Sequence, residues 1–158
     1  MTRPHCTWKD EPGPPLRYAT GCRVDDDQLG TLLGGTVLWE GPTQTIRHLK
    51  SLPVAQPAGL KKPWMHLTLS LPPSVELDQD AWVAALSLVM DTMGFPAKAV
   101  PWIAFQHPPN EKNVCHAHML ALSMTLSGRW LERSNMEARC DRAAAALQHH
   151  LAIPAAPR

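Results

Sequence analysis

The sequence predicts an α+β domain in which helices pack mainly on one face of a central antiparallel β-sheet. Residues 64–71 alternate strictly between apolar and polar side chains, which is typical of a strand buried on one face. An amphipathic helical pattern follows, and two further strand-like segments, 101–107 and 114–124, are joined by a short loop. Strands connected in this way pair antiparallel, and the interleaved helices then cover the sheet.

The length of 158 residues is typical of a single domain with a substantial core. We expect residues 16–151 to form that domain. Residues 1–15 are polar and rich in proline, so they are expected to be irregular. Residues 152–158 are expected to form a flexible tail.

The N-terminal half contains only short sequence patterns of helices and strands. Residues 16–20 predict a helical turn that ends at Gly21. Residues 32–39 predict a short strand with glycines near its start. Thr43 is expected to cap a helix that runs to Leu52, because threonine side chains accept hydrogen bonds from the first backbone amides of a helix.

The C-terminal half carries longer patterns. Asp78 or Asp80 is expected to open an amphipathic helix, which Gly94 ends. After the two later strands, Ser134 is expected to cap a last helix with apolar positions as far as Leu151.

The composition is that of a soluble globular protein, with 44% hydrophobic and 18% charged residues. Fifteen basic and 14 acidic residues leave a formal net charge of +1, which excludes a broadly basic surface for nucleic acid. No apolar run has the length of a membrane span. We therefore expect a cytoplasmic protein without a membrane partner, and a monomer.

The cysteines are far apart and form no Cys-x-x-Cys pair; they are Cys6, Cys22, Cys115 and Cys140. No secretory leader is recognisable before them, so reduced thiols are expected. A zinc site that combines Cys115 with His116 or His118 lacks the usual ligand spacing.

Three histidines are the most informative residues of the chain. His116 and His118 are two residues apart on a predicted strand, so their side chains share a face. His107 ends the strand before it, and a hairpin would bring all three rings together. Three neutral imidazoles can bind one divalent metal ion and leave positions open for a substrate oxygen. The alternative is three ordinary histidines on a solvated sheet face.

Two other residues are candidates for the same site. Tyr18 is the single tyrosine, and a phenol can attack a phosphodiester when a metal ion polarises the phosphate. Most tyrosines are instead packing residues. His66 lies on the polar face of its strand, where it would bind phosphate, support the metal ligands or simply be solvated. Basic residues that could contact DNA phosphates include Arg17, Arg23, Lys61 and Lys62.

The order of these segments resembles the relaxase, or mobilisation nuclease, domain of mobilisable plasmids, a group of the HUH endonucleases. Leu-Gly-Gly-Thr-Val is followed by Lys-Lys-Pro-Trp-Met-His-Leu-Thr-Leu-Ser-Leu-Pro-Pro, then by the helix from Trp82 to Met-Gly-Phe. Trp-Ile-Ala-Phe-Gln-His and His-Ala-His-Met complete the series. The similarity covers roughly residues 16–147, and the chain would correspond to the nuclease domain alone.

The resemblance implies an antiparallel sheet with helices and a site-specific and strand-specific nick at a plasmid origin of transfer. It implies Mg²⁺ or Mn²⁺ on His107, His116 and His118, with Tyr18 as the nucleophile. Single-stranded or melted origin DNA and relaxosome accessory proteins are the implied partners.

Two alternatives remain open. One is a catalytically inactive relaxase-like domain that binds DNA or a relaxosome protein. The other is a two-histidine phosphoesterase, for which His66-Leu67-Thr68 supplies one His-x-Thr motif while the second is missing.

Overall fold

The computed structural model describes residues 3–21, 30–52, 59–109 and 114–153, and these residues form five strands and four helices. The strands form one sheet in the order β1-β3-β5-β4-β2, and every neighbouring pair is antiparallel. In chain order the elements are β1 (His5–Lys9), α1 (Gly13–Thr20), β2 (Thr31–Gly35), α2 (Pro42–Ser51), β3 (Trp64–Ser70), α3 (Gln79–Thr92), β4 (Trp102–His107), β5 (His116–Leu122) and α4 (Met136–His150). The predicted α+β class with an antiparallel sheet is confirmed.

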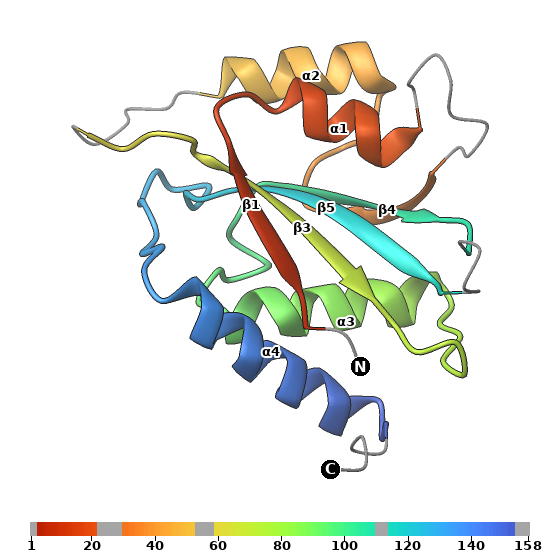
Figure 1. Cartoon of the computed structure of the whole chain (residues 1–158). Helices are drawn as coiled ribbons and strands as arrows, with labels where there is room; N and C mark the ends of the chain where they lie inside the picture. The colour runs from red at the N-terminus through yellow and green to blue at the C-terminus, as the bar shows by residue number, and fades with distance from the viewer. Residues whose placement is uncertain (1–2, 22–29, 53–58, 110–113, 154–158) are drawn as a thin grey trace.

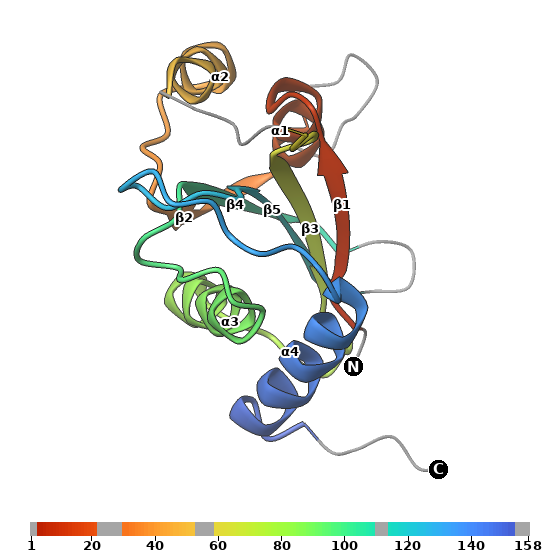
Figure 2. The ribbon, with the colours of Figure 1, turned by 90° about the vertical axis from the view of Figure 1, so that its left-hand side faces the viewer.

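Helices lie on both faces of the sheet (Figures 1 and 2). The two longer helices, α3 and α4, pack on one face. The two shorter ones, α1 and α2, lie over the other, where the sequence pattern had led us to expect little helical cover. Both are short and have few apolar residues, so their pattern does not show which face of the sheet they cover.

The alternation of β3 explains the two layers. Met65, Leu67 and Leu69 point into the core beneath α3 and α4 and are fully buried. Trp64 and the residues at positions 66, 68 and 70 face the opposite side of the sheet. There Trp64 joins a second core with residues of α1 and α2. Because strand side chains alternate between faces, one strand contributes to both cores.

The prediction that residues 1–15 are irregular is wrong. Residues 5–9 form β1, an edge strand paired with β3, and α1 begins at Gly13. Cys6 and Trp8 pack against the larger core, while the prolines lie on either side of the strand and do not interrupt it. An edge strand tolerates nearby proline because only one side of its backbone must be hydrogen-bonded.

The helix ends show which capping predictions hold. Asp78 caps α3 by accepting a hydrogen bond from the Ala81 amide at 2.8 Å, as expected. Thr43 does not cap α2, because Gly41 holds that position and Pro42 starts the helix, where proline's missing N–H costs nothing. Ser134 does not cap α4 either: Asn135 precedes the helix, and the Ser134 amide donates to the Glu132 carboxylate.

The strand predicted over residues 32–39 is shorter in the structure. Pairing of β2 with β4 stops at Gly35, after a bulge between Leu32 and Gly34. The amides of Thr36 and Val37 then both donate to the Trp102 carbonyl, which ends the regular ladder. The strand predicted over 114–124 is likewise trimmed to β5.

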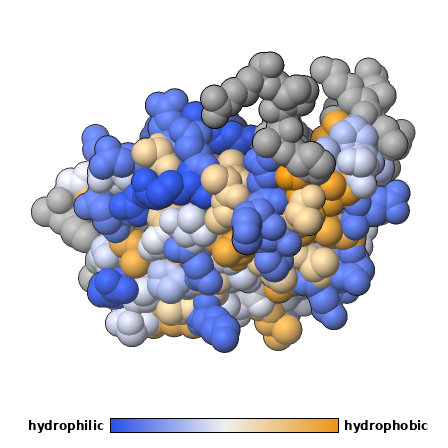
Figure 3. Space-filling view, turned by 90° about the horizontal axis from the view of Figure 1, so that it is seen from below, coloured by the Kyte–Doolittle hydropathy of each residue, from blue (hydrophilic) through white to orange (hydrophobic). Residues whose placement is uncertain are grey.

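The outer surface on the α3 and α4 side is mixed in character. Hydrophilic residues cover much of this face, with smaller hydrophobic areas between them (Figure 3). Within the described residues, no helix combines the length and apolar character that crossing a bilayer requires.

Candidate metal and nucleophile site

The sheet register brings the three predicted histidines together. His107 on β4 is directly opposite His116 on β5, and His118 follows on the same face two residues later. The ring centroids of His107 lie 5.1 Å from His116 and 4.4 Å from His118. One nitrogen from each ring lies within 4.8 Å of the others, a spacing that one metal ion can span.

Hydrogen bonds orient each of the three rings. His107 donates from Nε2 to the Ala19 carbonyl of α1 at 2.9 Å, and His116 donates from Nδ1 to the Val114 carbonyl at 3.4 Å. Nδ1 of His118 lies 3.2 Å from the Thr68 hydroxyl. The carbonyl partners leave Nδ1 of His107 and Nε2 of His116 to carry lone pairs, and Nε2 of His118 carries one when its Nδ1 donates to the Thr68 hydroxyl, the usual arrangement of a metal-binding histidine.

The cluster is more buried than its sequence suggested. The alternative of a solvated sheet face does not describe these two rings: His118 is 4% exposed and His107 6% exposed, because α1 lies over them. His116 is half-buried at the edge. A site closed on one side by a helix can exclude water from a bound ion while remaining open beside His116.

Burial also keeps His116 and His118 neutral. It lowers the pKa of His118 to about 3, and the neighbouring rings of His107, His66 and His116 lower it further. Burial lowers the pKa of His116 as well, against the opposing effect of its hydrogen bond to the Val114 carbonyl. A neutral ring has the lone pair that a metal ion requires.

The residues present fit a divalent metal ion. Nε2 of His118 is buried and has no hydrogen-bond partner among the described residues, which is costly unless something binds it. Ligand nitrogens at about 2.1 Å from one ion lie roughly 3.0–3.4 Å apart, so the rings need to shift by less than about 1 Å each. A cation would satisfy this nitrogen without rearranging the sheet.

Tyr18 lies in contact with the histidines. Its ring centroid is 5.0 Å from that of His118, 5.8 Å from His107 and 6.0 Å from His66. Leu16 and Ala19 anchor the underside of α1 in the smaller core. The structure therefore brings together Tyr18 and the three histidines that the sequence selected.

His66 forms part of the same cluster. Its Nε2 lies 3.1 Å from Nδ1 of His118, and the Thr68 hydroxyl shares that partner. Burial lowers the pKa of His66 to about 4, and the nearby charges of Lys9 and His5 lower it further. His66 is thus a neutral group that orients His118 from behind.

A pocket of about 230 Å³ opens beside the nucleophile candidate, lined by Lys9, Pro14, Pro15, Tyr18 and His66. Sequence reasoning missed Lys9, because residues 1–15 were expected to be irregular. The pattern that could have predicted this strand is the short run His-Cys-Thr-Trp-Lys, in which Cys6 and Trp8 alternate with polar residues. Lys9 supplies a positive charge next to the pocket that Tyr18 faces.

Among the other basic candidates in the described residues, Arg17 is a neighbour of Tyr18 on α1, and the two lysines lie farther away. Arg17 is exposed on α1 beside Tyr18, and the described residues show no bond from its side chain to the histidines. Lys61 and Lys62 precede β3, about 20 Å along the chain from Thr68. Their carbonyls accept hydrogen bonds from Arg133. Arg23 lies outside the described residues.

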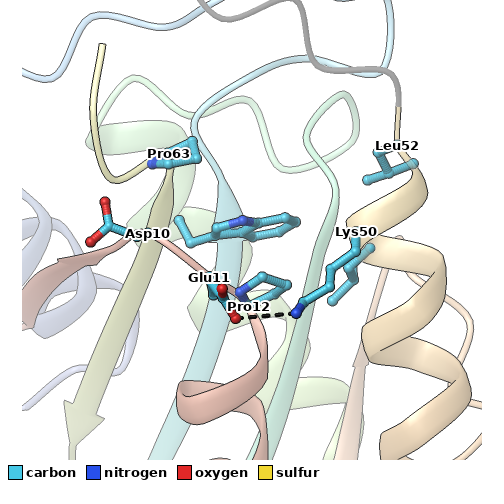
Figure 4. A pocket seen from close by; sticks show the side chains of 8 residues that line it. Asp10, Glu11, Pro12, Lys50, Leu52 and Pro63 are labelled. Carbon is cyan, nitrogen blue, oxygen red and sulfur yellow. Dashed lines mark hydrogen bonds and ion pairs between the residues drawn. The ribbon is translucent and has the colours of Figure 1, made fainter.

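A second pocket, of about 430 Å³, lies toward the start of β3 (Figure 4). Asp10 and Glu11 stand at its edge, and Glu11 pairs with Lys50 at 3.1 Å. Trp64, also among its lining residues, is only 5% exposed, so it offers little ring surface for stacking. Carboxylates at the edge repel phosphate, so this pocket is a poorer site for a nucleic acid than the histidine cluster.

Comparison with known proteins adds no relative: no protein-family model matches the chain, and no curated protein matches it significantly. The chemistry of the histidine cluster and Tyr18 must therefore be inferred from their geometry and from the resemblance in motif order.

Proposed function

We propose that this chain is a metal-dependent DNA endonuclease of the relaxase type, which nicks one strand by attack of Tyr18 on a phosphodiester. One observation carries the proposal: a phenol and three imidazoles, from three separate elements, meet at one place. A metal ion beside a tyrosine is what covalent phosphodiester cleavage needs, and a structural role requires no such grouping.

The proposed chemistry is a single exchange of ester bonds. The Tyr18 oxygen loses its proton and forms a bond to phosphorus, while the bond from phosphorus to the 3′-oxygen breaks. The 3′-oxygen leaves as a hydroxyl after taking up a proton, and the 5′-phosphate remains linked to the tyrosine. The exchange needs neither water nor a nucleotide cofactor.

The metal site would be formed by His107, His116 and His118. A bound Mg²⁺ or Mn²⁺ supplies Lewis-acid polarisation of the phosphate and neutralises charge that develops on its oxygens. The described cluster contains imidazoles without a carboxylate, which favours Mn²⁺ over Mg²⁺, because Mg²⁺ prefers oxygen ligands.

His66 and Thr68 would hold His118 in position. Both contact its Nδ1, so the opposite nitrogen is directed away from β3. Their role is analogous to the outer hydrogen bonds that fix metal-binding histidines in other proteins.

The proposed substrate is single-stranded or locally melted DNA, as at an origin of transfer. A net charge of +1 provides few cations to neutralise the phosphates of a DNA duplex. Binding a short single strand requires only a few basic side chains close to the site. Lys9 and the exposed Arg17 lie close to Tyr18 in the chain and are the first candidates for these contacts. Relaxosome proteins would supply further affinity to a monomer that acts in the cytoplasm.

A covalent-adduct assay tests the proposal. The full chain is incubated with Mn²⁺ and a 3′-labelled library of random single-stranded oligonucleotides, then separated under denaturing conditions. We expect a labelled protein band that depends on Mn²⁺, and a phosphorylated Tyr18 peptide after nuclease and protease digestion. Tyr18→Phe should lose the band while binding Mn²⁺ with unchanged affinity, because it removes only the attacking oxygen.

The other outcomes identify the alternatives. DNA binding without any adduct would contradict catalysis and favour a non-catalytic relaxase-like module. Metal-independent cleavage of a 2′,3′-cyclic phosphate would instead favour the two-histidine phosphoesterase, of which His66-Leu67-Thr68 supplies one motif.

A further inference from the structure

Two cysteines far apart in the sequence lie side by side in the fold. Sγ of Cys6 on β1 is 3.7 Å from Sγ of Cys140 on α4, although 134 positions separate them. Both are free thiols in the structure. They lie on the face of the sheet opposite the histidines, since Cys6 and Cys140 belong to the larger core with α3 and α4.

Several contacts hold these two elements together. Arg3, just before β1, forms ion pairs with Glu137 at 3.1 Å and with Asp141 at 3.2 Å, both on α4. These pairs are exposed and contribute little stability by themselves. Their geometry nevertheless aligns the start of β1 with the first turns of α4, one on each side of Cys140.

The contact between the two thiols affects the pKa of each. A hydrogen bond from Cys6 lowers the pKa of Cys140, and the Arg3 guanidinium lowers it further. The same hydrogen bond and burial raise the pKa of Cys6. Because either sulfur atom can donate in this contact, either thiol can supply the nucleophilic thiolate, with the other lying next to it as the resolving thiol.

Small reagents can reach the pair. A pocket of about 570 Å³ is lined by both cysteines and by Arg3, Pro4, His5, Met136 and Glu137. Cys140 is only 3% exposed, so it is protected from large partners, while the half-buried Cys6 is the more accessible of the two cysteines that line the pocket.

We propose that Cys6 and Cys140 are a reversible disulfide site that ties β1 to α4 when a low-molecular-weight disulfide oxidises the protein. One of the two cysteines, as its thiolate, attacks one sulfur of the small disulfide and releases the first half of that molecule as a thiol. The sulfur of the other cysteine then displaces the second half, giving the Cys6–Cys140 bond. In total two protein thiols lose two electrons and two protons, and the small disulfide becomes two thiols.

The required movement is modest. A disulfide bond is about 2.05 Å long, so the sulfur atoms must approach by roughly 1.7 Å, which side-chain rotation can supply. The bond would close a loop spanning most of the chain. Such a long loop restricts the unfolded state strongly, so oxidation should raise the midpoint of thermal unfolding by ~10 °C.

A redox titration tests this site. The reduced full chain is equilibrated with mixtures of oxidised and reduced glutathione, free thiols are alkylated, and linked peptides are mapped by mass spectrometry. We expect one linked pair, Cys6 with Cys140, together with the higher unfolding midpoint, and reversal of both by excess reduced glutathione. Cys115→Ala is the matched control, because Cys115 lies outside this pair, and it should behave like the wild type.

Cys6→Ala removes one thiol of the pair at a half-buried position and spares the buried Cys140. This variant should fold, form no linked peptide and show no oxidation-dependent rise in the unfolding midpoint. The proposal is overturned if oxidised wild-type protein carries glutathione on Cys6 or Cys140 without a link between them. A link from either residue to Cys22 or Cys115 as the main product would overturn it equally.

Discussion

His118 makes contact with every other residue of the proposed site. Its ring lies within about 5 Å of the rings of His107, His116, His66 and Tyr18, centroid to centroid. Nδ1 contacts two side chains of β3, and Nε2 is buried without a partner among the residues that the structure describes. At the scale of single residues, the site is therefore organised around one imidazole whose unsatisfied nitrogen a metal ion would bind.

Substitution of individual ligand histidines can test metal binding without unfolding the protein. The double variant His116→Ala/His118→Ala should lose more than about 100-fold in Mn²⁺ affinity, measured by calorimetry, because it removes two of three ligands. His116→Ala alone, at a half-buried position, should keep the native circular dichroism and still bind Mn²⁺ more weakly.

His149→Ala is the control for that experiment, since His149 is exposed on α4 and away from the cluster. Unchanged Mn²⁺ affinity in the double variant would show that the ion, if bound, uses other residues.

The neutral histidines also predict how stability responds to acid. The pKa of His66 is about 4 in the fold and near 6.5 when the chain is unfolded, so between these values the unfolded state binds more protons. The free energy of unfolding of the metal-free protein should fall as pH drops from about 6.5 to about 4, by on the order of 2 kcal/mol from this residue.

Urea unfolding at a series of pH values, with a chelator present, measures this dependence. His66→Gln removes the titrating group, so its unfolding free energy should change less over the same interval. If the unfolding free energy changed equally with pH in the wild type and in His66→Gln, the burial assigned to His66 would be contradicted.

Helix α1 is the element that assembles the site. It carries Tyr18, covers the histidines, and supplies the Ala19 carbonyl that orients His107. Gly21, with φ 70°, ends the helix in the left-handed region that glycine adopts without strain. Gly30 lies immediately beneath, where its amide donates to the Thr20 carbonyl.

The close approach of α1 to the sheet depends on Gly30 having no side chain. A Cβ at this position would overlap the Ala19 carbonyl oxygen and lie 3.3 Å from Cβ of Phe105. Gly30→Ala should therefore lift α1, reduce the free energy of unfolding by about 2 kcal/mol, and weaken Mn²⁺ binding through His107.

Gly41→Ala serves as the comparison. Gly41 has φ 85°, and a Cβ there meets no atom within 4 Å, so the substitution costs about 1 kcal/mol of backbone strain alone. Its Mn²⁺ affinity should equal that of the wild type. Equal losses of metal affinity in the two variants would mean that α1 does not control the site.

At the scale of the whole molecule, the sheet separates two functions. One face packs on α3 and α4 in the larger core, which contains Leu86, Met90 and Leu147, all fully buried. The other face carries the histidines and a smaller core beneath α1 and α2. Stability thus comes mainly from one side of the sheet and the proposed chemistry from the other.

This separation predicts that core damage on the α4 side leaves the site intact. Leu147→Ala should reduce the free energy of unfolding by about 3 kcal/mol and lower the melting temperature by about 10 °C. Mn²⁺ affinity at a temperature where the variant is folded should not change.

Leu126→Ala is the matched control, because Leu126 is 63% exposed and its loss should shift unfolding by less than about 0.5 kcal/mol. A loss of Mn²⁺ affinity in folded Leu147→Ala would show that the two faces are energetically coupled.

Local periodicity in the sequence was enough to determine the central strands, the capped helix α3 and the shared face of His116 and His118. Alternation along a strand and the Asp78 cap are properties of neighbouring residues, so the sequence displays them directly. The three histidines, Tyr18 and His66 could be named as candidate site residues from their places in these local patterns and from the resemblance in motif order.

Only the tertiary structure decided which segments meet. Pairing of β1 with β3, the position of α1 over the histidines and the contact of Cys6 with Cys140 join residues far apart in the chain. Whether His118 is buried and which of its nitrogens lacks a partner follow from those long-range contacts. Packing of distant elements determines burial and hydrogen bonding, and no local pattern records it.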